Sequence, residues 1–170
     1  MLRLTVRANF SERTVVLPEL YCWEVSPTSG VHRVKLDRIG LEVARATSLV
    51  KYEPNQQFPN HRHDGGEETL VLSGTFMDAA GIYPEGTYLR NPPGTSHQPS
   101  AGPEGALLFV KLHQFREGDT VSCRIQTKKS AWLPGLVSGL KVLPLLLPVP
   151  MGHSLTLRLD TYQIKTKSSI

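Results

Sequence analysis

Three histidines and one glutamate in the middle of the chain have the types and the spacing of a transition-metal site. His61 and His63 are two residues apart, and side chains alternate along a strand, so both would point to the same side. The Gly65-Gly66 pair allows a tight turn that would bring Glu67 back toward them. His97 would have to come from a second strand, and a β-barrel is a simple way to bring two such strands together.

Imidazole nitrogens and a carboxylate suit zinc, iron, copper, nickel and, less readily, manganese. A metal with more than four coordination positions would keep room for water or substrate, whereas zinc could close tetrahedrally with these four ligands. A single histidine is usually a surface or core residue, but here glycines and prolines also fall at fixed offsets around the set. We expect one divalent transition metal, zinc or Fe(II) ahead of manganese or nickel.

The elements that position these residues are predicted to be strands. The chain has 170 residues, 39% hydrophobic and 20% charged, which fits a soluble globular protein of one domain, or of one domain and a fragment. Its 14 glycines and 13 prolines separate short apolar runs, and no window shows a clean helical period, so we expect an all-β protein. The predicted strands include residues 14–17, 31–36, 44–52, 68–72, 75–77, 87–90, 106–112 and 120–125.

Charge and cysteine content argue against several classes of protein. The net charge is +4, and residues 111–170 carry 9 of the 19 Lys and Arg but only 3 of the 15 Asp and Glu. The basic residues are not interleaved with aromatics, so a solvated face and tail are favoured over a nucleic-acid surface.

Cys22 and Cys123 are interpreted as reduced thiols. The first residues lack the apolar core of a signal peptide, and residues 140–150 are too short and proline-rich to span a bilayer. We expect a cytoplasmic protein with neither a membrane nor a nucleic acid as partner.

Two longer patterns identify a family. His61 to Gly74 has the pattern HxHxxxExxxxxxG, and Gly86 to His97 has the pattern GxxxxxPxGxxH. These resemble the two signature motifs of the cupin superfamily. The first motif usually begins with a glycine six residues before its first histidine; this chain has Asn55 there, which also tolerates a left-handed turn. The second often ends with an asparagine where this chain has Ala101.

Within the superfamily, the chain is similar to the ChrR-like cupin domain over roughly residues 14–125. The similarity is carried by the segments 46–52, 58–63, 65–68, 71–74 and 88–94. It implies a cupin-type double-stranded β-helix, or jelly-roll barrel, with short N-terminal strands and a C-terminal strand extension. It also implies the metal ligands His61, His63, Glu67 and His97. Glu68 is the rival for the carboxylate, but its spacing fits the motif less well.

The resemblance leaves the activity open. Similar proteins include an iron dioxygenase of 2,4'-dihydroxyacetophenone and the zinc-binding domain of ChrR-type anti-sigma factors. The chain is therefore expected to be a metal-dependent dioxygenase on a small organic, aromatic ketone-like substrate, or a zinc-binding sensor or regulatory domain without catalysis, or a binding cupin without turnover. A helical Cys/His-rich segment such as the one that binds the sigma factor is not evident, which weakens a direct anti-sigma role. No catalytic residue is assigned.

Other residues have weaker signals. Arg90, Tyr88 and Phe76 could line the cavity and bind an anionic substrate, although ordinary packing explains them equally well. His113 follows the second motif and could support the metal ligands from behind. His32 and His153 are interpreted as structural.

A partial repeat suggests how the chain is divided. Trp23 and Trp132 are each followed seven residues later by a glycine, and then by apolar residues at matching offsets. We expect a cupin barrel with the metal site over residues 1–125. Residues 126–170 would be a partial second cupin-like unit, or an extension that packs on a barrel or on a partner subunit. A homodimer is expected from the family and from this incomplete unit.

Overall fold

The structure, a computed structural model, describes residues 5–41 and 44–145, and almost all of its regular elements are β-strands. The strands are β1 (Thr5–Val6), β2 (Glu24–Val25), β3 (Val31–Ile39), β4 (Arg45–Tyr52), β5 (His61–Arg62), β6 (Glu67–Asp78), β7 (Gly81–Pro84), β8 (Thr87–Asn91), β9 (Ser96–His97), β10 (Ser100–Leu112), β11 (Cys123–Gln126), β12 (Leu133–Pro134) and β13 (Lys141–Val142). The one helical element among the described residues is a short 3₁₀ turn, η1 (Pro18–Leu20). The predicted all-β class is confirmed.

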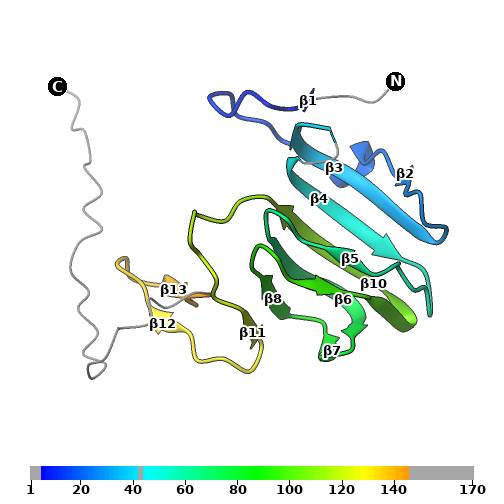
Figure 1. The fold of residues 1–170 in the computed structure, drawn as a ribbon. Coiled ribbons are helices and arrows are strands. Elements are labelled where there is room, and N and C mark those ends of the chain that lie inside the picture. The colour runs from blue at the N-terminus through cyan, green and yellow to red at the C-terminus, as the bar shows by residue number, and fades with distance from the viewer. Residues whose placement is uncertain (1–4, 42–43, 146–170) are drawn as a thin grey trace.

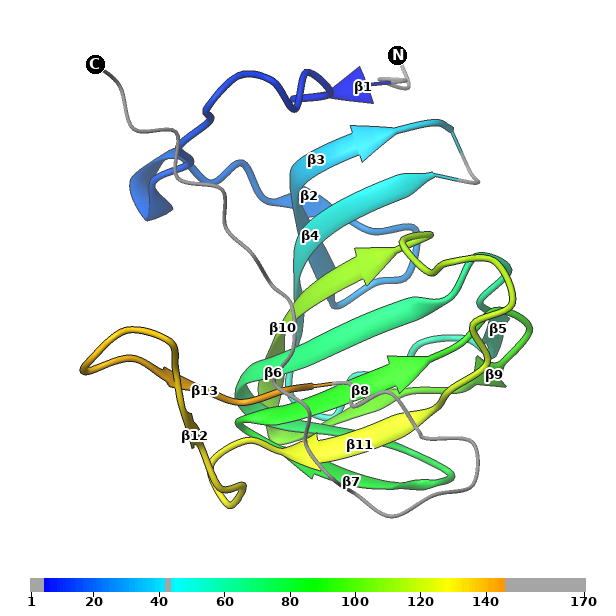
Figure 2. The ribbon, with the colours of Figure 1, turned by 90° about the vertical axis from the view of Figure 1, so that its left-hand side faces the viewer.

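Nine strands form one antiparallel sheet. The order along its main path is β1-β3-β4-β10-β6-β8-β11, with β2 paired to β3 and β7 paired to β6. The sheet is strongly curled, as Figure 2 shows, with β3 and β4 above and β8 and β11 below. The pair β5–β9 forms a separate small sheet beside it (Figure 2), and β12–β13 forms another (Figure 1). This curled arrangement is the cupin-type barrel expected from the motifs.

Strand β6 is continuous through a position where the sequence suggests a break. Residues 68–72 and 75–77 were predicted as two strands separated at Gly74, but both lie in β6. The ladder between β6 and β10 passes Gly74 through a register shift opposite residues 101–106. Gly74 has a φ of 73°, and a Cβ there would overlap the Gly105 carbonyl. Glycine thus permits a bulge within the strand.

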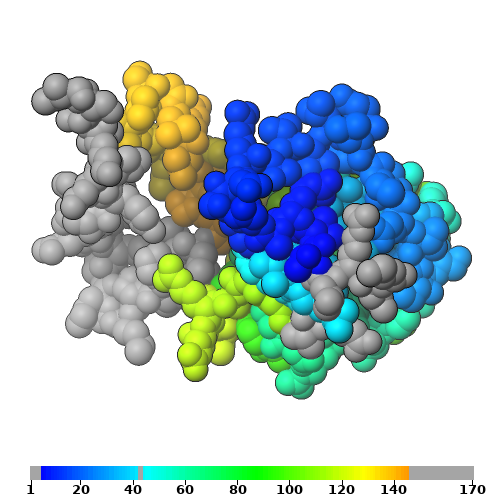
Figure 3. All heavy atoms as spheres, turned by 90° about the horizontal axis from the view of Figure 1, so that it is seen from above, coloured from blue at the N-terminus to red at the C-terminus, as the bar shows by residue number. Residues whose placement is uncertain are grey.

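The N-terminal segment differs from its prediction. Residues 14–17 form no strand; they lead directly into η1, where a proline occupies the first turn. The strand pairing occurs earlier, because β1 pairs with the end of β3. The Arg7 guanidinium fixes this segment by donating to the Lys35 carbonyl at 2.9 Å, and Arg45 lies over the Phe10 ring at 4.4 Å. Figure 3 shows the N-terminal residues, in blue, spread over this end of the molecule.

The hydrophobic core lies on the concave side of the sheet. It includes Val31, Val71, Leu89 and Leu108, each at most 2% exposed, and the rings of Tyr52, Phe76 and Tyr83. Directly paired residues of neighbouring strands share one face, so these side chains from β3, β4, β10 and β6 meet in one interior. The core holds the sheet rigidly around the metal-site motifs.

The C-terminal part of the described chain consists of β11, which pairs with β8, and the hairpin β12–β13. The Trp132 indole donates to the Thr127 carbonyl at 3.3 Å. The division into residues 1–125 and 126–170 stays a prediction, and His153 lies outside the described residues. Within residues 5–41 and 44–145, no helix has the length and the apolar character needed to cross a membrane.

Candidate metal site

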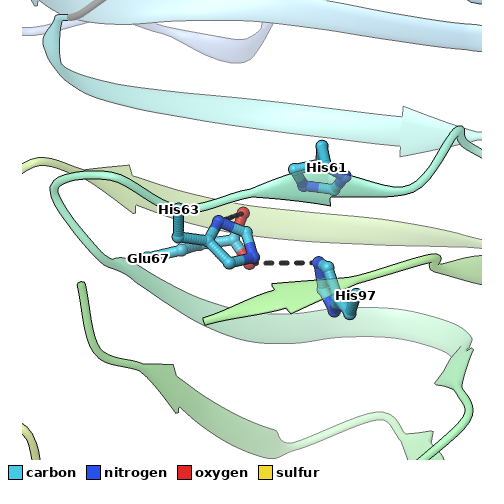
Figure 4. A group of neighbouring side chains, drawn as sticks. All are labelled: His61, His63, Glu67 and His97. Carbon is cyan, nitrogen blue, oxygen red and sulfur yellow. Dashed lines mark ion pairs between the residues drawn. The ribbon is translucent and has the colours of Figure 1, made fainter. Parts of the chain in front are cut away.

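The structure brings the four predicted side chains together. His61, His63, Glu67 and His97 each offer one ligand atom, and these atoms lie within 4.8 Å of one another. The three imidazole rings form a triangle with centroid separations of 4.7 to 4.9 Å. Figure 4 shows them converging from β5, from the turn that follows it, and from β9, with Glu67 entering from the start of β6.

Backbone pairing explains the convergence. His61 pairs directly with His97 across β5 and β9, so the second histidine comes from a neighbouring strand as predicted. The His63 carbonyl accepts hydrogen bonds from the Gly94 amide at 2.8 Å and the Gly66 amide at 3.4 Å. Gly66 has a φ of 79° and Gly94 a φ of 90°, the left-handed region that favours glycine. The two glycine turns of the motifs therefore close on the same peptide group.

Hydrogen bonds fix which ring nitrogen of two histidines is available. The His61 Nδ1 lies 3.1 Å from the Pro59 carbonyl, which can only accept, so this nitrogen carries the proton. The His97 Nδ1 lies 3.1 Å from an Asp78 carboxylate oxygen. The Nε2 atoms of both rings are then left with free lone pairs, which is the form that binds a metal.

Asp78 is itself held in place. Its Oδ1 accepts the Tyr83 hydroxyl at 2.8 Å and the Ala80 amide at 2.8 Å, while its Oδ2 faces His97. Burial opposes ionisation, but hydrogen bonds from Tyr83 and His97 outweigh it and lower the pKa of Asp78. The side chain is 3% exposed. An ionised carboxylate behind a histidine is the arrangement that orients metal-binding imidazoles.

The two candidate carboxylates face opposite ways. Glu67 points into the histidine triangle, with its oxygens 3.9 Å from the His63 and His97 nitrogens. Its Oε1 accepts from the Asn91 amide at 3.2 Å. Glu68 instead accepts the Tyr88 hydroxyl at 2.5 Å and Lys111 at 2.9 Å. Adjacent residues of a strand alternate sides, so only Glu67 can join the group.

The cluster has the chemistry of a metal site rather than of a hydrogen-bonded core. His63 Nε2 and His97 Nε2 are buried and have no hydrogen-bond partner among the described residues. Burial lowers the pKa of His61 and of His63, which keeps both rings neutral. Buried polar atoms are normally satisfied, so unpaired nitrogens at the centre of four ligand-type side chains fit a cation. The residues present therefore fit the group that the motifs imply.

A cavity of about 390 Å³ opens beside the cluster. Its walls come from the inner faces of β3, β4, β10 and β6 and from the histidine-bearing segments. Phe76 lines it as predicted, and so does His113, which stands against Gly65. Arg33 and Tyr52 also line it, and neither was predicted from the sequence to do so. Burial, with the Glu67 charge second, raises the pKa of Tyr52, so its hydroxyl stays protonated.

The prediction that Arg90 and Tyr88 line the cavity is wrong. Register explains the error: Glu67 pairs with Asn91 across β6 and β8, whereas Glu68 pairs with Arg90. Arg90 is therefore on the side of the sheet that faces away from the cluster, where it binds Asp119 and the Val121 carbonyl. His32 also lies away from the cluster, with its Nε2 3.0 Å from the Glu53 carboxylate.

Sequence reasoning missed Asp78, Asn91 and Arg33. Asp78 had a turn signal only, and its link to His97 crosses 19 residues. Asn91 is the last residue of β8. Alternation along β8 places it on the same face as Glu67 only when the register between β6 and β8 is also known. Arg33 falls two residues after the fully buried Val31, so period-two alternation was a usable signal of an inward-facing charge.

Comparison with known proteins supports the fold. An RmlC-like cupin from Ralstonia eutropha aligns with a TM-score of 0.53 and 13% identity, over 69% of this chain and 81% of that one. An RmlC-like cupin from Shewanella frigidimarina aligns with a TM-score of 0.50 and 17% identity, over 62% and 95%. A chain of the Rhodobacter sphaeroides complex of SigE with the anti-sigma ChrR aligns at 0.48 and 23%, over 56% of this chain and about half (51%) of that one. No curated protein matches the chain.

The family of the chain is established by its sequence, independently of the fold comparison. The model of the ChrR cupin-like domain matches residues 11–116, which is more than half of the chain. This range contains both glycine turns and all four side chains of the cluster. The chain therefore belongs to the ChrR cupin-like domain family.

Proposed function

We propose that the protein binds one divalent transition metal through His61, His63, Glu67 and His97 and uses it on a small organic molecule that enters the adjacent cavity. The observation that carries this proposal is the position of the cluster. Its unpaired nitrogens lie at the wall of a 390 Å³ cavity rather than in a closed core. A metal with a purely structural role is normally enclosed by its ligands, whereas a catalytic one keeps an open position.

A bound metal of this kind would supply Lewis acidity or, for iron, access to oxygen chemistry. The residues of the chain have separate tasks around it. Asp78 holds His97 with its Nε2 toward the centre, and Asn91 orients the Glu67 carboxylate. Arg124 in turn donates to the Asn91 oxygen at 2.6 Å, which fixes the direction of the amide. The apolar side chains of Val50, Leu108 and Phe76 limit water on the cavity side.

A dioxygenase acting on an aromatic ketone-like substrate is the specific activity that we propose. Cavities of about 300 Å³ or more hold small organic ligands, and this one has aromatic and aliphatic walls. The alternative is a zinc-binding regulatory domain without turnover. Membership in the ChrR cupin-like family supports this alternative, whereas a regulatory domain would not need an open cavity beside the metal.

The test combines metal analysis with oxygen uptake. Protein purified without an affinity tag should contain about one metal per chain, and the Fe(II)-loaded form should consume oxygen when an aromatic ketone is added. Tight zinc without oxygen uptake in the Fe(II) form would favour the regulatory alternative. Protein that binds neither metal would refute the proposed function altogether. The expected homodimer and cytoplasmic location stay predictions; light scattering tests the first.

A further inference from the structure

Arg33 is the one cavity-lining arginine whose charge is not matched inside the described chain. Its Nε is buried and has no hydrogen-bond partner there. None of the ion pairs among the described residues includes it. Its guanidinium carbon lies 5.7 Å from the centre of the Phe58 ring, which is a weak cation–π contact. Leaving a buried donor of a charged group unpaired is costly, and such groups normally find a partner.

Strand register aims this side chain at the cavity. Arg33 pairs with Val50 on β4, and Val50 pairs with Leu108 on β10. Directly paired residues share a face of the sheet, and all three line the same cavity. The cavity lining also includes His61, whose ring packs edge-on against Phe58 at 5.2 Å. Phe58 therefore stands between the guanidinium and the metal cluster, and both face the same space.

The charge of the cavity favours an anion. Its other charged lining residues are Arg62, Asp64 and Glu67. Arg62 and Asp64 pair with each other at 2.9 Å, and both are mostly exposed. A divalent metal would more than neutralise Glu67, and Arg33 adds a further positive charge. A site with net positive charge and mostly apolar walls attracts a negatively charged organic molecule.

We propose that the cavity binds a small organic anion, a carboxylate or a compound of equivalent charge, with its acidic group on Arg33 and its other end toward the metal cluster. The guanidinium offers several N–H donors in a planar fork that matches a carboxylate. The Tyr52 hydroxyl, which lines the same wall, is a further donor. This inference rests on the proposed metal-dependent function and restricts its substrates, aromatic ketones included, to those that also carry an acidic group.

The test measures binding of a panel of aliphatic and aromatic carboxylates, each with its neutral amide, by calorimetry. Wild type is compared with Arg33→Gln and with Arg62→Gln, a matched control on the exposed rim. Carboxylates should bind wild type, and Arg33→Gln should weaken that binding about tenfold to a hundredfold. Arg62→Gln should change it less than about twofold, and the amides should bind no better to wild type than to Arg33→Gln.

Two further measurements distinguish a lost binding contact from a lost fold: thermal unfolding of Arg33→Gln, and carboxylate binding by Arg33→Lys. Thermal unfolding establishes that Arg33→Gln is folded, and Arg33→Lys, which keeps the charge but not the fork, should bind with intermediate affinity. All titrations are run on metal-loaded and metal-free protein. Loss of carboxylate binding on removal of Arg33, in either form, supports the proposal. Equal binding by wild type and Arg33→Gln in both forms, or no carboxylate binding at all, overturns it. Metal content measured on the same samples reports separately on the proposed function.

Discussion

Two arginines on opposite faces of this sheet are in opposite circumstances. Arg90 is 4% exposed; it donates to Asp119 and to the Val121 carbonyl and stacks over Phe115 at 4.0 Å. Arg33 has a buried Nε without a partner and faces the cavity. The hydrogen bond with Asp119 raises the pKa of Arg90, because the neighbouring carboxylate stabilises the charged guanidinium.

This difference in partners distinguishes an arginine that stabilises the fold from an arginine that is available to bind a ligand. A guanidinium whose charge is paired with carboxylates of the same chain holds loops together, as Arg90 does for residues 115–121. A guanidinium with free donors at a cavity wall can bind something that the protein does not supply. Residue type is the same in both places, and only the partners distinguish them. The following predictions test this contrast, in order of expected effect.

The largest effect is expected from the double replacement His61→Ala and His63→Ala. Two of four ligands are removed, so stoichiometric metal binding should be lost, as measured by elemental analysis after dialysis. His32→Ala is the control, because that histidine pairs with Glu53 away from the cavity. If the double variant kept one metal per chain, the cavity region would have no special chemistry and the contrast with the Arg90 region would fail.

Arg90→Gln should destabilise the fold by about 2–3 kcal/mol in urea unfolding, because Asp119 and Glu68 would lose their shared partner. Arg33→Gln should leave the free energy of unfolding unchanged or raise it by up to about 1 kcal/mol, since no ion pair is lost and a buried donor without a partner is removed. Metal affinity should be unchanged in Arg90→Gln. Equal destabilisation by the two substitutions would contradict the assigned roles.

Asp78→Asn should weaken metal binding by about tenfold to a hundredfold, which is the usual effect of removing a carboxylate behind a ligand histidine. The amide keeps the size of the side chain but no longer holds His97 with a negative charge. Asp64→Asn is the matched control: Asp64 follows His63 directly in the sequence, but its carboxylate is exposed and pairs with Arg62. Competition with a chromogenic chelator measures both, and an unchanged affinity in Asp78→Asn would remove Asp78 from the site.

The smallest effect concerns Asp119. Its hydrogen bond with Arg90 holds its pKa below the usual range. Because the pKa is lower in the folded than in the unfolded state, the pair stabilises the fold above the ordinary pKa of Asp, near 3.9, and this contribution disappears as the pH falls through the folded-state value. Asp119→Asn should therefore cost about 1 kcal/mol at neutral pH and progressively less in acid. A cost that stays constant with pH would show that charge is not involved.

Much of the fold was predictable from local patterns. The strands at residues 31–36 and 44–52 follow alternation, and those at 87–90 and 106–112 follow short β-like runs; each lies within or almost entirely within a strand of the structure. Asn55 was expected to tolerate a left-handed turn and has a φ of 57°. The errors are at residues 14–17, at Gly74 and at residues 120–122, which precede β11 instead of belonging to it; at each, pairing with a distant strand decided the outcome. Local propensity cannot report whether a neighbouring strand supplies hydrogen bonds.

For this protein, the sequence by itself identified the four side chains that the structure brings together, because the spacing of His61 and His63, the two glycine turns and His97 are local properties of two short motifs. Only the tertiary structure decided which of the other polar residues belong to the cavity. Arg33, Asp78 and Arg90 are assigned by the register of β3 against β4, by the approach of β6 to β9, and by the pairing of β6 with β8. A shift of one residue in any of these pairings would exchange the two faces of a strand, and that register depends on contacts between segments far apart in the chain.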